Sequence, residues 1–282
     1  MLKRLLGCVA LVTVFGGQAP SPSPSPGFEV VQLVSLVAGG ATLTGQLKRP
    51  DKPGRLPAVV ALHGCGGVLT AKGQVSARDV DWADRFAAAG YVVLFPDSFN
   101  PRGFRQICTL KAEERTIRPR DRAEDAAAAI AWLANQPFVD PARIALIGWS
   151  HGGSTVLWSV RGDGPAAAAK IKTAIAFYPG CRVPSESKSW QARSPLAILI
   201  GDADDWTPPE SCRVLKANHP AIRLIEYPGA VHGFDAPNSP LRTRTDVGQS
   251  QKGDGRAKVG TDPKARAAAI DEVQRILADA FK

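Results

Sequence analysis

Hydrophobic and polar residues alternate loosely over residues 28–36 and more regularly over residues 42–47. This alternation predicts an antiparallel hairpin at the edge of a sheet. Further along the chain, short apolar runs bounded by Gly, Pro or Asp have the length and composition of buried parallel strands. These runs cover residues 58–62, 91–95, 144–147, 173–178, 196–200 and 222–227.

Helical spacing of apolar residues appears between these strands and after the last of them. It predicts helices over residues 75–89, 120–136 and 262–281. The expected buried positions are Trp82, Phe86 and Ala89 in the first helix, and Ala267, Ile270, Val273, Ile276 and Leu277 in the last. Because strands and helices alternate with no break in composition, residues 28–282 are predicted to form one α/β domain around a mostly parallel sheet.

The stretch Gly148-Trp149-Ser150-His151-Gly152 is a G-x-S-x-G match between a predicted strand and a segment that can be helical. That order is the context in which this motif presents a nucleophilic serine on a sharp turn. Gly148 and Gly152 remove the Cβ atoms that would clash where strand and helix cross. We therefore expect Ser150 to be a nucleophile, with the start of the following helix directing free N–H groups at the site.

A serine nucleophile needs a base to take its proton and a carboxylate to hold that base. Of the four histidines, His219 and His232 follow the candidate acids; His219 precedes Pro220 after a helical stretch, whereas His232 lies in a loop after the last predicted strand and is the expected base. The acid is expected after the penultimate strand, where the pattern Gly-x-x-Asp-x-x-x-Pro favours Asp204 and leaves Asp205 as a second choice. Asp202 or Asp205 is expected to cap the helix that begins near Pro209.

The oxyanion that forms during such a reaction needs two backbone donors. We expect the N–H groups of His151, the residue after the nucleophile, and of Cys65, in the glycine-rich turn after an earlier strand. Aromatic and basic residues near the ends of the strands are candidates for a substrate pocket. Trp149, Arg102 and Phe104 are the ones we select. The polar segment 238–258 is interpreted as a solvated surface loop rather than a flap over the site.

The first 27 residues differ from the rest of the chain. A short basic start precedes eleven apolar residues, too few to span a bilayer but typical of a signal peptide, here residues 1–19. Residues 20–27 form a Ser-Pro linker. The remaining cysteines, Cys65, Cys108, Cys181 and Cys212, are even in number, as in exported proteins with disulfides. Because neighbouring parallel strands end close together, we expect the pairs 65–108 and 181–212.

Composition adds little beyond these motifs. The formal net charge is +9, yet the chain has no nucleic-acid-binding motif and no long basic run. The charge is therefore interpreted as an aid to solubility and weak steering of anions, without a nucleic-acid partner. After removal of the leader no stable membrane insertion is expected, and the sequence contains no signal for an oligomeric state.

The combination of His63-Gly64-Cys65-Gly66-Gly67, Gly148-Trp149-Ser150-His151-Gly152-Gly153, Asp204-Asp205-Trp206-Thr207-Pro208 and His232-Gly233-Phe234 resembles the dienelactone hydrolase family of the α/β-hydrolase superfamily. The resemblance covers essentially residue 56 to the C-terminus. It implies the α/β-hydrolase fold, an eight-stranded, mostly parallel sheet with helices on both faces, and no large cap domain. It also implies hydrolysis of a small ester or lactone through an acyl-enzyme, without cofactor or metal.

The sequence departs from the founding members of that family. Their nucleophile is a cysteine, and their oxyanion strand lacks the His-Gly-Cys-Gly-Gly turn. A basic residue in the loop after their fourth strand binds a substrate carboxylate, whereas Arg102 and Arg105 match its spacing poorly. Two other functions are considered: a peptidase of the same fold, and a catalytically silent binding protein that keeps the fold. A peptidase usually carries an extra domain, and a silent relative need not retain the nucleophile, acid, base and oxyanion turns together.

Overall fold

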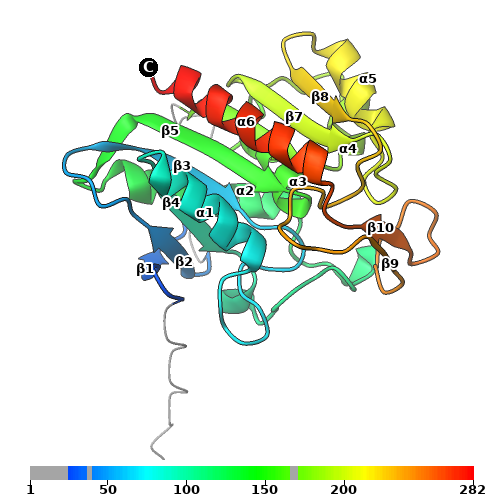
Figure 1. Cartoon of the computed structure of the whole chain (residues 1–282), viewed down its shortest axis with the longest axis horizontal. Coiled ribbons are helices and arrows are strands. Elements are labelled where there is room, and N and C mark those ends of the chain that lie inside the picture. The colour runs from blue at the N-terminus through cyan, green and yellow to red at the C-terminus, as the bar shows by residue number, and fades with distance from the viewer. Residues whose placement is uncertain (1–24, 37–39, 166–170) are drawn as a thin grey trace, which may run out of the picture.

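The computed structural model describes residues 25–36, 40–165 and 171–282. The predicted leader and most of the Ser-Pro linker lie outside these residues. Eight strands form one sheet in the order β1-β2-β4-β3-β5-β6-β7-β8 (Figure 1). The strands are β1 (Glu29–Leu33), β2 (Leu43–Lys48), β3 (Leu56–Leu62), β4 (Val92–Asp97), β5 (Val139–Trp149), β6 (Ile171–Phe177), β7 (Leu196–Gly201) and β8 (Arg223–Tyr227).

The pairing of the strands confirms the predicted sheet. β1 and β2 form an antiparallel hairpin, and β2 also runs antiparallel to β4. Every other neighbouring pair is parallel, from β4–β3 through to β7–β8. The carboxyl ends of the parallel strands therefore lie along one edge, where α/β sheets bind their ligands.

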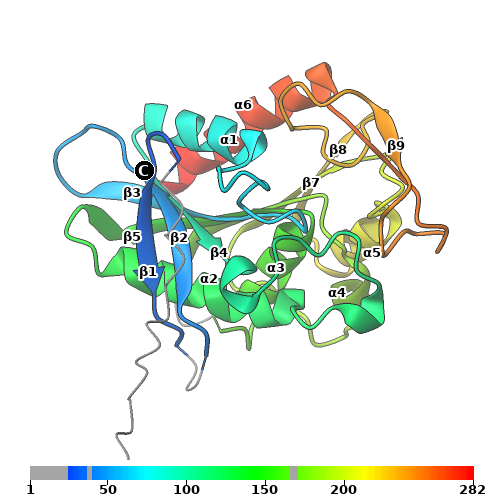
Figure 2. The ribbon, with the colours of Figure 1, turned by 90° about the horizontal axis from the view of Figure 1, so that it is seen from below.

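Helices cover both faces of this sheet, as Figure 2 shows. α1 and α6 lie on one face and α2 and α3 on the other. The helices are α1 (Ala77–Ala88), α2 (Pro119–Ala134), α3 (His151–Ser159), α4 (Arg182–Glu186), α5 (Glu210–Asn218) and α6 (Pro263–Ala280), with short 3-10 turns η1 (Asn100–Arg102) and η2 (Ala112–Glu114). Between β6 and β7 the described residues form only the five-residue α4, so the described chain carries no large cap.

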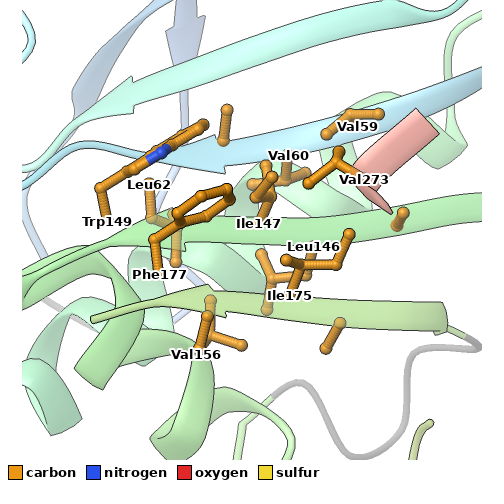
Figure 3. Packing of buried hydrophobic residues seen from close by; sticks show 14 of the residues in the cluster. Val59, Val60, Leu62, Leu146, Ile147, Trp149, Val156, Ile175, Phe177 and Val273 are labelled. Carbon is orange, nitrogen blue, oxygen red and sulfur yellow. The ribbon is translucent and has the colours of Figure 1, made fainter. Parts of the chain in front are cut away.

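The core consists of the apolar side chains on both faces of the central strands. Figure 3 shows Val59, Val60 and Leu62 of β3 beside Leu146 and Ile147 of β5, with Val273 of α6 close to Val59 and Val60. These side chains are fully buried, which accounts for the continuous apolar runs in the sequence. No helix in the described part of the chain is long and apolar enough to cross a membrane.

Several predicted boundaries and faces were wrong in detail. α1 begins at Ala77 rather than at residue 75, because the Ser76 side chain accepts a hydrogen bond from the Asp79 N–H and caps the helix there. Ala89 and Ala267 are exposed, and the buried stripe of α6 runs instead through Ala265, Ala269, Ile270, Val273 and Leu277. β5 begins five residues earlier than the apolar run. Its first residues after Val139 are largely exposed and polar or small, so they do not belong to the apolar pattern.

Candidate active site

Ser150 lies on the sharp turn between β5 and α3. Its φ of 53° and ψ of −115° are values that non-glycine residues rarely adopt. Its N–H donates to the Phe177 carbonyl of β6 at 2.9 Å, which holds the turn against the neighbouring strand. A Cβ on Gly148 would lie 2.4 Å from the Gly152 oxygen, and a Cβ on Gly152 would lie 2.0 Å from the Leu62 oxygen. The predicted requirement for glycine at both positions is confirmed.

The structure brings Ser150, His232 and Asp204 into one hydrogen-bonded chain. Ser150 Oγ lies 2.9 Å from His232 Nε2, and His232 Nδ1 lies 2.8 Å from Asp204 Oδ2. A carboxylate only accepts, so Nδ1 carries the imidazole proton and Nε2 is free to accept from the serine hydroxyl. Asp205, the second choice, instead accepts the Lys258 N–H at 2.8 Å. The geometry favours Asp204 over Asp205 as the partner of the histidine.

The helix-capping role expected of the acidic cluster was wrong. α5 begins after Pro209 and has no side-chain cap. Asp202 accepts the N–H of Gly229 at 2.6 Å, so it ties the loop after β7 to the loop after β8. Asp202 and Asp205 thus hold two neighbouring loops in place around the acid.

Thr207 is a member of the site that the sequence analysis did not single out. Its Oγ1 lies 3.1 Å from both Asp204 Oδ2 and His232 Nδ1, and 3.0 Å from the Tyr178 carbonyl. The Thr207 N–H also donates to Asp204 Oδ1 at 2.8 Å. These contacts fix the carboxylate by both of its oxygens. A hydroxyl three residues after an aspartate is a recognisable local hydrogen-bonding pattern, so the sequence held a signal for it.

The loop that carries His232 is fixed by the residues just after the segment 238–258. That segment is mostly exposed, as expected of a solvated surface loop, but it also contains most of a short hairpin formed by β9 (Arg242–Arg244) and β10 (Ala257–Val259). Val259 forms an isolated parallel β-bridge with His232, and the Gly260 N–H donates a hydrogen bond to the His232 carbonyl at 3.2 Å. The imidazole packs against the rings of Tyr178 and Trp206, with centroids 4.5 and 4.7 Å away.

The two backbone donors expected for an oxyanion belong to the residue after Ser150 and to the turn that packs against it. Within the described residues neither the Cys65 N–H nor the His151 N–H has an acceptor. The turn that carries Cys65 lies against the elbow, because a Cβ on Gly64 would be 3.6 Å from Ser150 Cβ. Both N–H groups are therefore available beside the serine hydroxyl.

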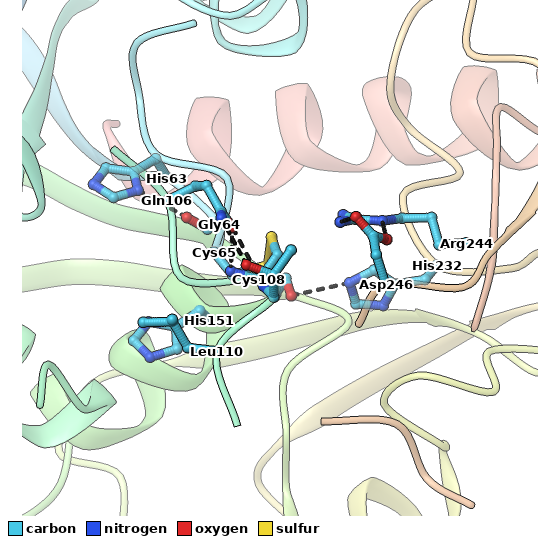
Figure 4. Close-up of a disulfide and its surroundings, with 12 residues drawn as sticks. His63, Gly64, Cys65, Gln106, Cys108, Leu110, His151, His232, Arg244 and Asp246 are labelled. Atoms are coloured by element: carbon cyan, nitrogen blue, oxygen red, sulfur yellow. Dashed lines mark hydrogen bonds and ion pairs between the residues drawn. A yellow bond between two sulfur atoms is a disulfide. The ribbon is translucent and has the colours of Figure 1, made fainter. Parts of the chain in front are cut away.

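A disulfide fixes the Cys65 turn from its outer side. Cys65 is bonded to Cys108, and the Ile107 N–H donates to the Cys65 carbonyl at 2.8 Å. Figure 4 shows this disulfide between the His63-Gly64 turn and His232. The second disulfide joins Cys181 and Cys212. Both predicted pairings are confirmed.

His63 and His151 are buried histidines behind the oxyanion turns. The Nδ1 atom of His63 lies 2.8 Å from the Gly64 carbonyl, and its Nε2 accepts the Ser98 N–H at 3.3 Å. Burial, together with repulsion from the Arg122 guanidinium, lowers the pKa of both histidines well below the usual value. Both rings are therefore neutral, and they act as packing and hydrogen-bonding groups rather than as bases.

The prediction that Trp149 lines a substrate pocket was wrong. Its side chain is completely buried, stacks on Phe177 with centroids 5.7 Å apart, and packs against Trp82 at 5.8 Å. In this structure it offers no surface to a substrate.

Arg102 was also a wrong choice for a free substrate-binding cation. Both of its terminal nitrogens hydrogen bond to the Asp125 carboxylate, at 2.7 and 2.9 Å, so its charge is already paired. Phe104 is partly buried against the small cluster that contains Cys65 and Cys108, and it stays a candidate for the rim of the site.

Arg78, near the start of α1, is the cation that borders the nucleophile. Its Nη2 would lie 3.7 Å from a Cβ on Gly64, the position that is also 3.6 Å from Ser150 Cβ. It bonds weakly to Asp79 at 3.3 Å and to the Tyr178 hydroxyl at 3.5 Å. The sequence analysis missed it, although an arginine at the start of the helix that follows the oxyanion turn is a signal that could have been used.

A cleft of about 560 Å³ lies beside Asp204 rather than at Ser150. The loop after β7 and the segment that contains the β9–β10 hairpin line it, with both carboxylates and cations among the lining side chains. Nowhere in residues 25–36, 40–165 and 171–282 do three or more His, Cys, Asp or Glu side chains gather in a way that could hold a metal ion.

Comparisons with known proteins agree with this architecture. A Bradyrhizobium protein named as a probable 2-oxo-3-(5-oxofuran-2-ylidene)propanoate lactonase is 25% identical over 217 residues, 71% of this chain and 82% of its own. Among solved structures, Thermogutta terrifontis esterase 2 is 19% identical with a TM-score of 0.64, covering 93% of this chain and 97% of its own.

A dienelactone hydrolase-like promiscuous phosphotriesterase from metagenomic libraries is 18% identical with a TM-score of 0.66, covering 91% of this chain and all of its own. At such identities the two structures show a common fold. The model of the dienelactone hydrolase family matches residues 43–280, which include the elbow, the acid and the base. With strands β2 to β8 and every element of the site inside that match, the chain belongs to the dienelactone hydrolase family.

Proposed function

We propose that the protein is a serine hydrolase that cleaves carboxylic esters or lactones through an acyl-enzyme. The observation that carries the proposal is the hydrogen-bonded chain from Ser150 through His232 to Asp204. Membership of the dienelactone hydrolase family and the similarity to a protein named as a lactonase support the substrate class.

In the first half of the reaction Ser150 Oγ attacks the carbonyl carbon while its proton passes to His232 Nε2. The carbonyl oxygen becomes an oxyanion and accepts hydrogen bonds from the N–H groups of Cys65 and His151. Asp204 holds the imidazole in its tautomer and stabilises its charged form. The tetrahedral intermediate then collapses, and the leaving alkoxide takes the proton from His232.

In the second half a water molecule repeats these steps on the acyl-enzyme. His232 removes a proton from the water, which attacks the acyl carbon, and the same proton returns to Ser150 Oγ as the acid leaves. For a lactone the alcohol and the acid are parts of one molecule, so a single hydroxy acid is released.

Labelling with a fluorophosphonate, read by intact mass, tests the nucleophile. The wild type should gain one adduct and turn over p-nitrophenyl acetate, whereas Ser150→Ala should do neither. A folded wild type that takes no label and shows no turnover would reject the proposal in favour of a silent α/β-hydrolase fold.

We also propose that the protein is exported, with residues 1–19 as a signal peptide and residues 20–27 as a linker before the hydrolase domain, residues 28–282. Two disulfides support an exported location, since such bonds persist in oxidising compartments. The N-terminal sequence of the protein recovered from bacterial periplasm or culture medium tests it. A mature chain that still begins at Met1 would contradict it.

A further inference from the structure

Arg122 is a fully buried arginine in the first turn of α2, behind the oxyanion turns. Its side chain has no exposed surface, and its Nη1 lies 2.9 Å from Nδ1 of His151. Arginine is seldom fully buried unless a carboxylate pairs with it. The environment of this guanidinium therefore needs an explanation.

The charge of Arg122 is not paired. In the described part of the chain no carboxylate lies within ion-pair distance of it, and its Nε and Nη2 have no hydrogen-bond partner. The nearest acids serve other groups: Asp125 is bonded to Arg102, and one oxygen of Asp97 accepts the Phe99 N–H at 3.0 Å. Its remaining neighbour is the Phe99 ring, whose centroid lies 5.0 Å from the guanidinium carbon.

The contact with His151 fixes the state of that ring. An arginine only donates, so His151 Nδ1 is the acceptor and the imidazole proton lies on Nε2. Burial lowers the pKa of His151, and repulsion from the charged groups that face it, Arg122 and Arg115, lowers it further, while a hydrogen bond to the backbone of Ile117 opposes this. The result is a neutral, fixed imidazole with a cation behind it that forms no ion pair within the described residues.

We propose that Arg122 is a positioning residue for the reaction at Ser150. It holds His151, whose N–H faces the oxyanion, and its unpaired charge favours negative charge at that place. This inference rests on the function proposed above. The covalent geometry of histidine brings the guanidinium to roughly 10 Å from the oxyanion. At an effective dielectric of about 20, a unit charge at that distance changes the rate roughly tenfold.

Three substitutions separate charge from packing. Arg122→Met removes the charge and the donor, Arg122→Gln keeps a donor without the charge, and Arg122→Lys keeps the charge. Arg266→Met is the matched control. Arg266 lies on α6, on the other face of the sheet, and is also a mostly buried arginine with an unpartnered Nε, but it forms an ion pair with Asp81 of α1 at 2.7 Å. For each variant we would measure kcat and KM for p-nitrophenyl acetate and the Tm.

We expect kcat to fall roughly tenfold in Arg122→Met and in Arg122→Gln, with KM changed less than about twofold, because the effect belongs to the transition state. Arg122→Lys should recover most of kcat, and Arg266→Met should change Tm alone. If Arg122→Met does not fold, Arg122→Gln and Arg122→Lys carry the comparison.

An unchanged kcat in the folded neutral variants would overturn the inference. So would an equal loss of kcat in Arg122→Lys and Arg122→Met, which would indicate packing alone. These results differ from a failure of the proposed function, in which the wild type itself would take no fluorophosphonate and show no turnover that depends on Ser150.

Discussion

Gly152 lies where α3 packs closely against the end of β3. Replacing it with alanine would displace the backbone donors of the site without changing a catalytic side chain. The new Cβ would lie 2.0 Å from the Leu62 oxygen and 2.7 Å from the His63 oxygen. These are backbone atoms, which cannot swing aside as a side chain would. Ordinary contact begins near 3.4 Å, so the helix must retreat by roughly 1.4 Å.

That retreat carries the His151 N–H away from the Cys65 N–H, because His151 begins the helix and Cys65 follows the strand. A misplacement of about 1 Å costs on the order of 100-fold in rate. Overpacking costs roughly 1–3 kcal/mol of stability, which lowers the Tm by about 2–4 °C per kcal/mol in a domain of this size. Gly152→Ala should therefore stay folded at 25 °C and lose about 100-fold in kcat.

The control is Gly66→Ala in the oxyanion turn itself, where an added Cβ would meet nothing within 4 Å. Its kcat and Tm should stay close to those of the wild type. The assay is p-nitrophenyl acetate turnover together with thermal unfolding followed by circular dichroism. A folded Gly152→Ala protein with wild-type kcat would refute the reasoning that close packing of helix and strand sets the oxyanion geometry.

Three further predictions concern other parts of the site. Thr207→Val removes a hydroxyl bonded to the acid and base and should lower kcat roughly tenfold, since a hydrogen bond to a charged group contributes roughly 1.5–3 kcal/mol; a kcat within twofold of wild type would contradict this. Replacing Cys65 and Cys108 by serine should cost about 2–4 kcal/mol of stability and also lower kcat. Removing the Cys181–Cys212 disulfide should affect stability alone. Equal kcat values in the two disulfide variants would count against a role for the Cys65–Cys108 bond in the oxyanion turn. Burial holds the pKa of His63 and His151 low, so the unfolded chain binds more protons than the native protein, and the stability present above about pH 6.5 should be lost as the pH falls below it. Between pH 7.5 and 5 the Tm should therefore fall less steeply in His63→Gln than in the wild type. Parallel curves of Tm against pH would show that the buried histidines are not the cause of the acid sensitivity.

The order of elements and the candidate nucleophile could be predicted because they depend on local patterns. A strand, a G-x-S-x-G turn and a helix follow one another within a few residues, and of the two histidines after both aspartates only His232 follows the last strand. The choice between Asp204 and Asp205 was harder, because the two are adjacent. The Lys258 N–H, 53 residues away, engages Asp205, and no local pattern reports such a contact.

Trp149 was misplaced although the sequence contained the correct answer. Side chains alternate along a strand, so Trp149 shares a face of β5 with Ile147, and that face is core. Arg102 and Arg122 could not be assigned in this way. Both appear as polar residues in surface-like segments, and only the tertiary structure pairs the first with Asp125 and leaves the second buried without a carboxylate.

The contacts that hold His232 have a consequence for how the enzyme comes into being. Val259 and the Gly260 N–H fix the His232 loop, and the Asp262 N–H bonds to the Phe234 carbonyl at 3.1 Å. These partners lie more than a hundred residues after Ser150 in the chain. A nascent chain therefore carries the serine long before the residues that hold its base are made, and the onset of turnover reports that residues 259–262 have docked.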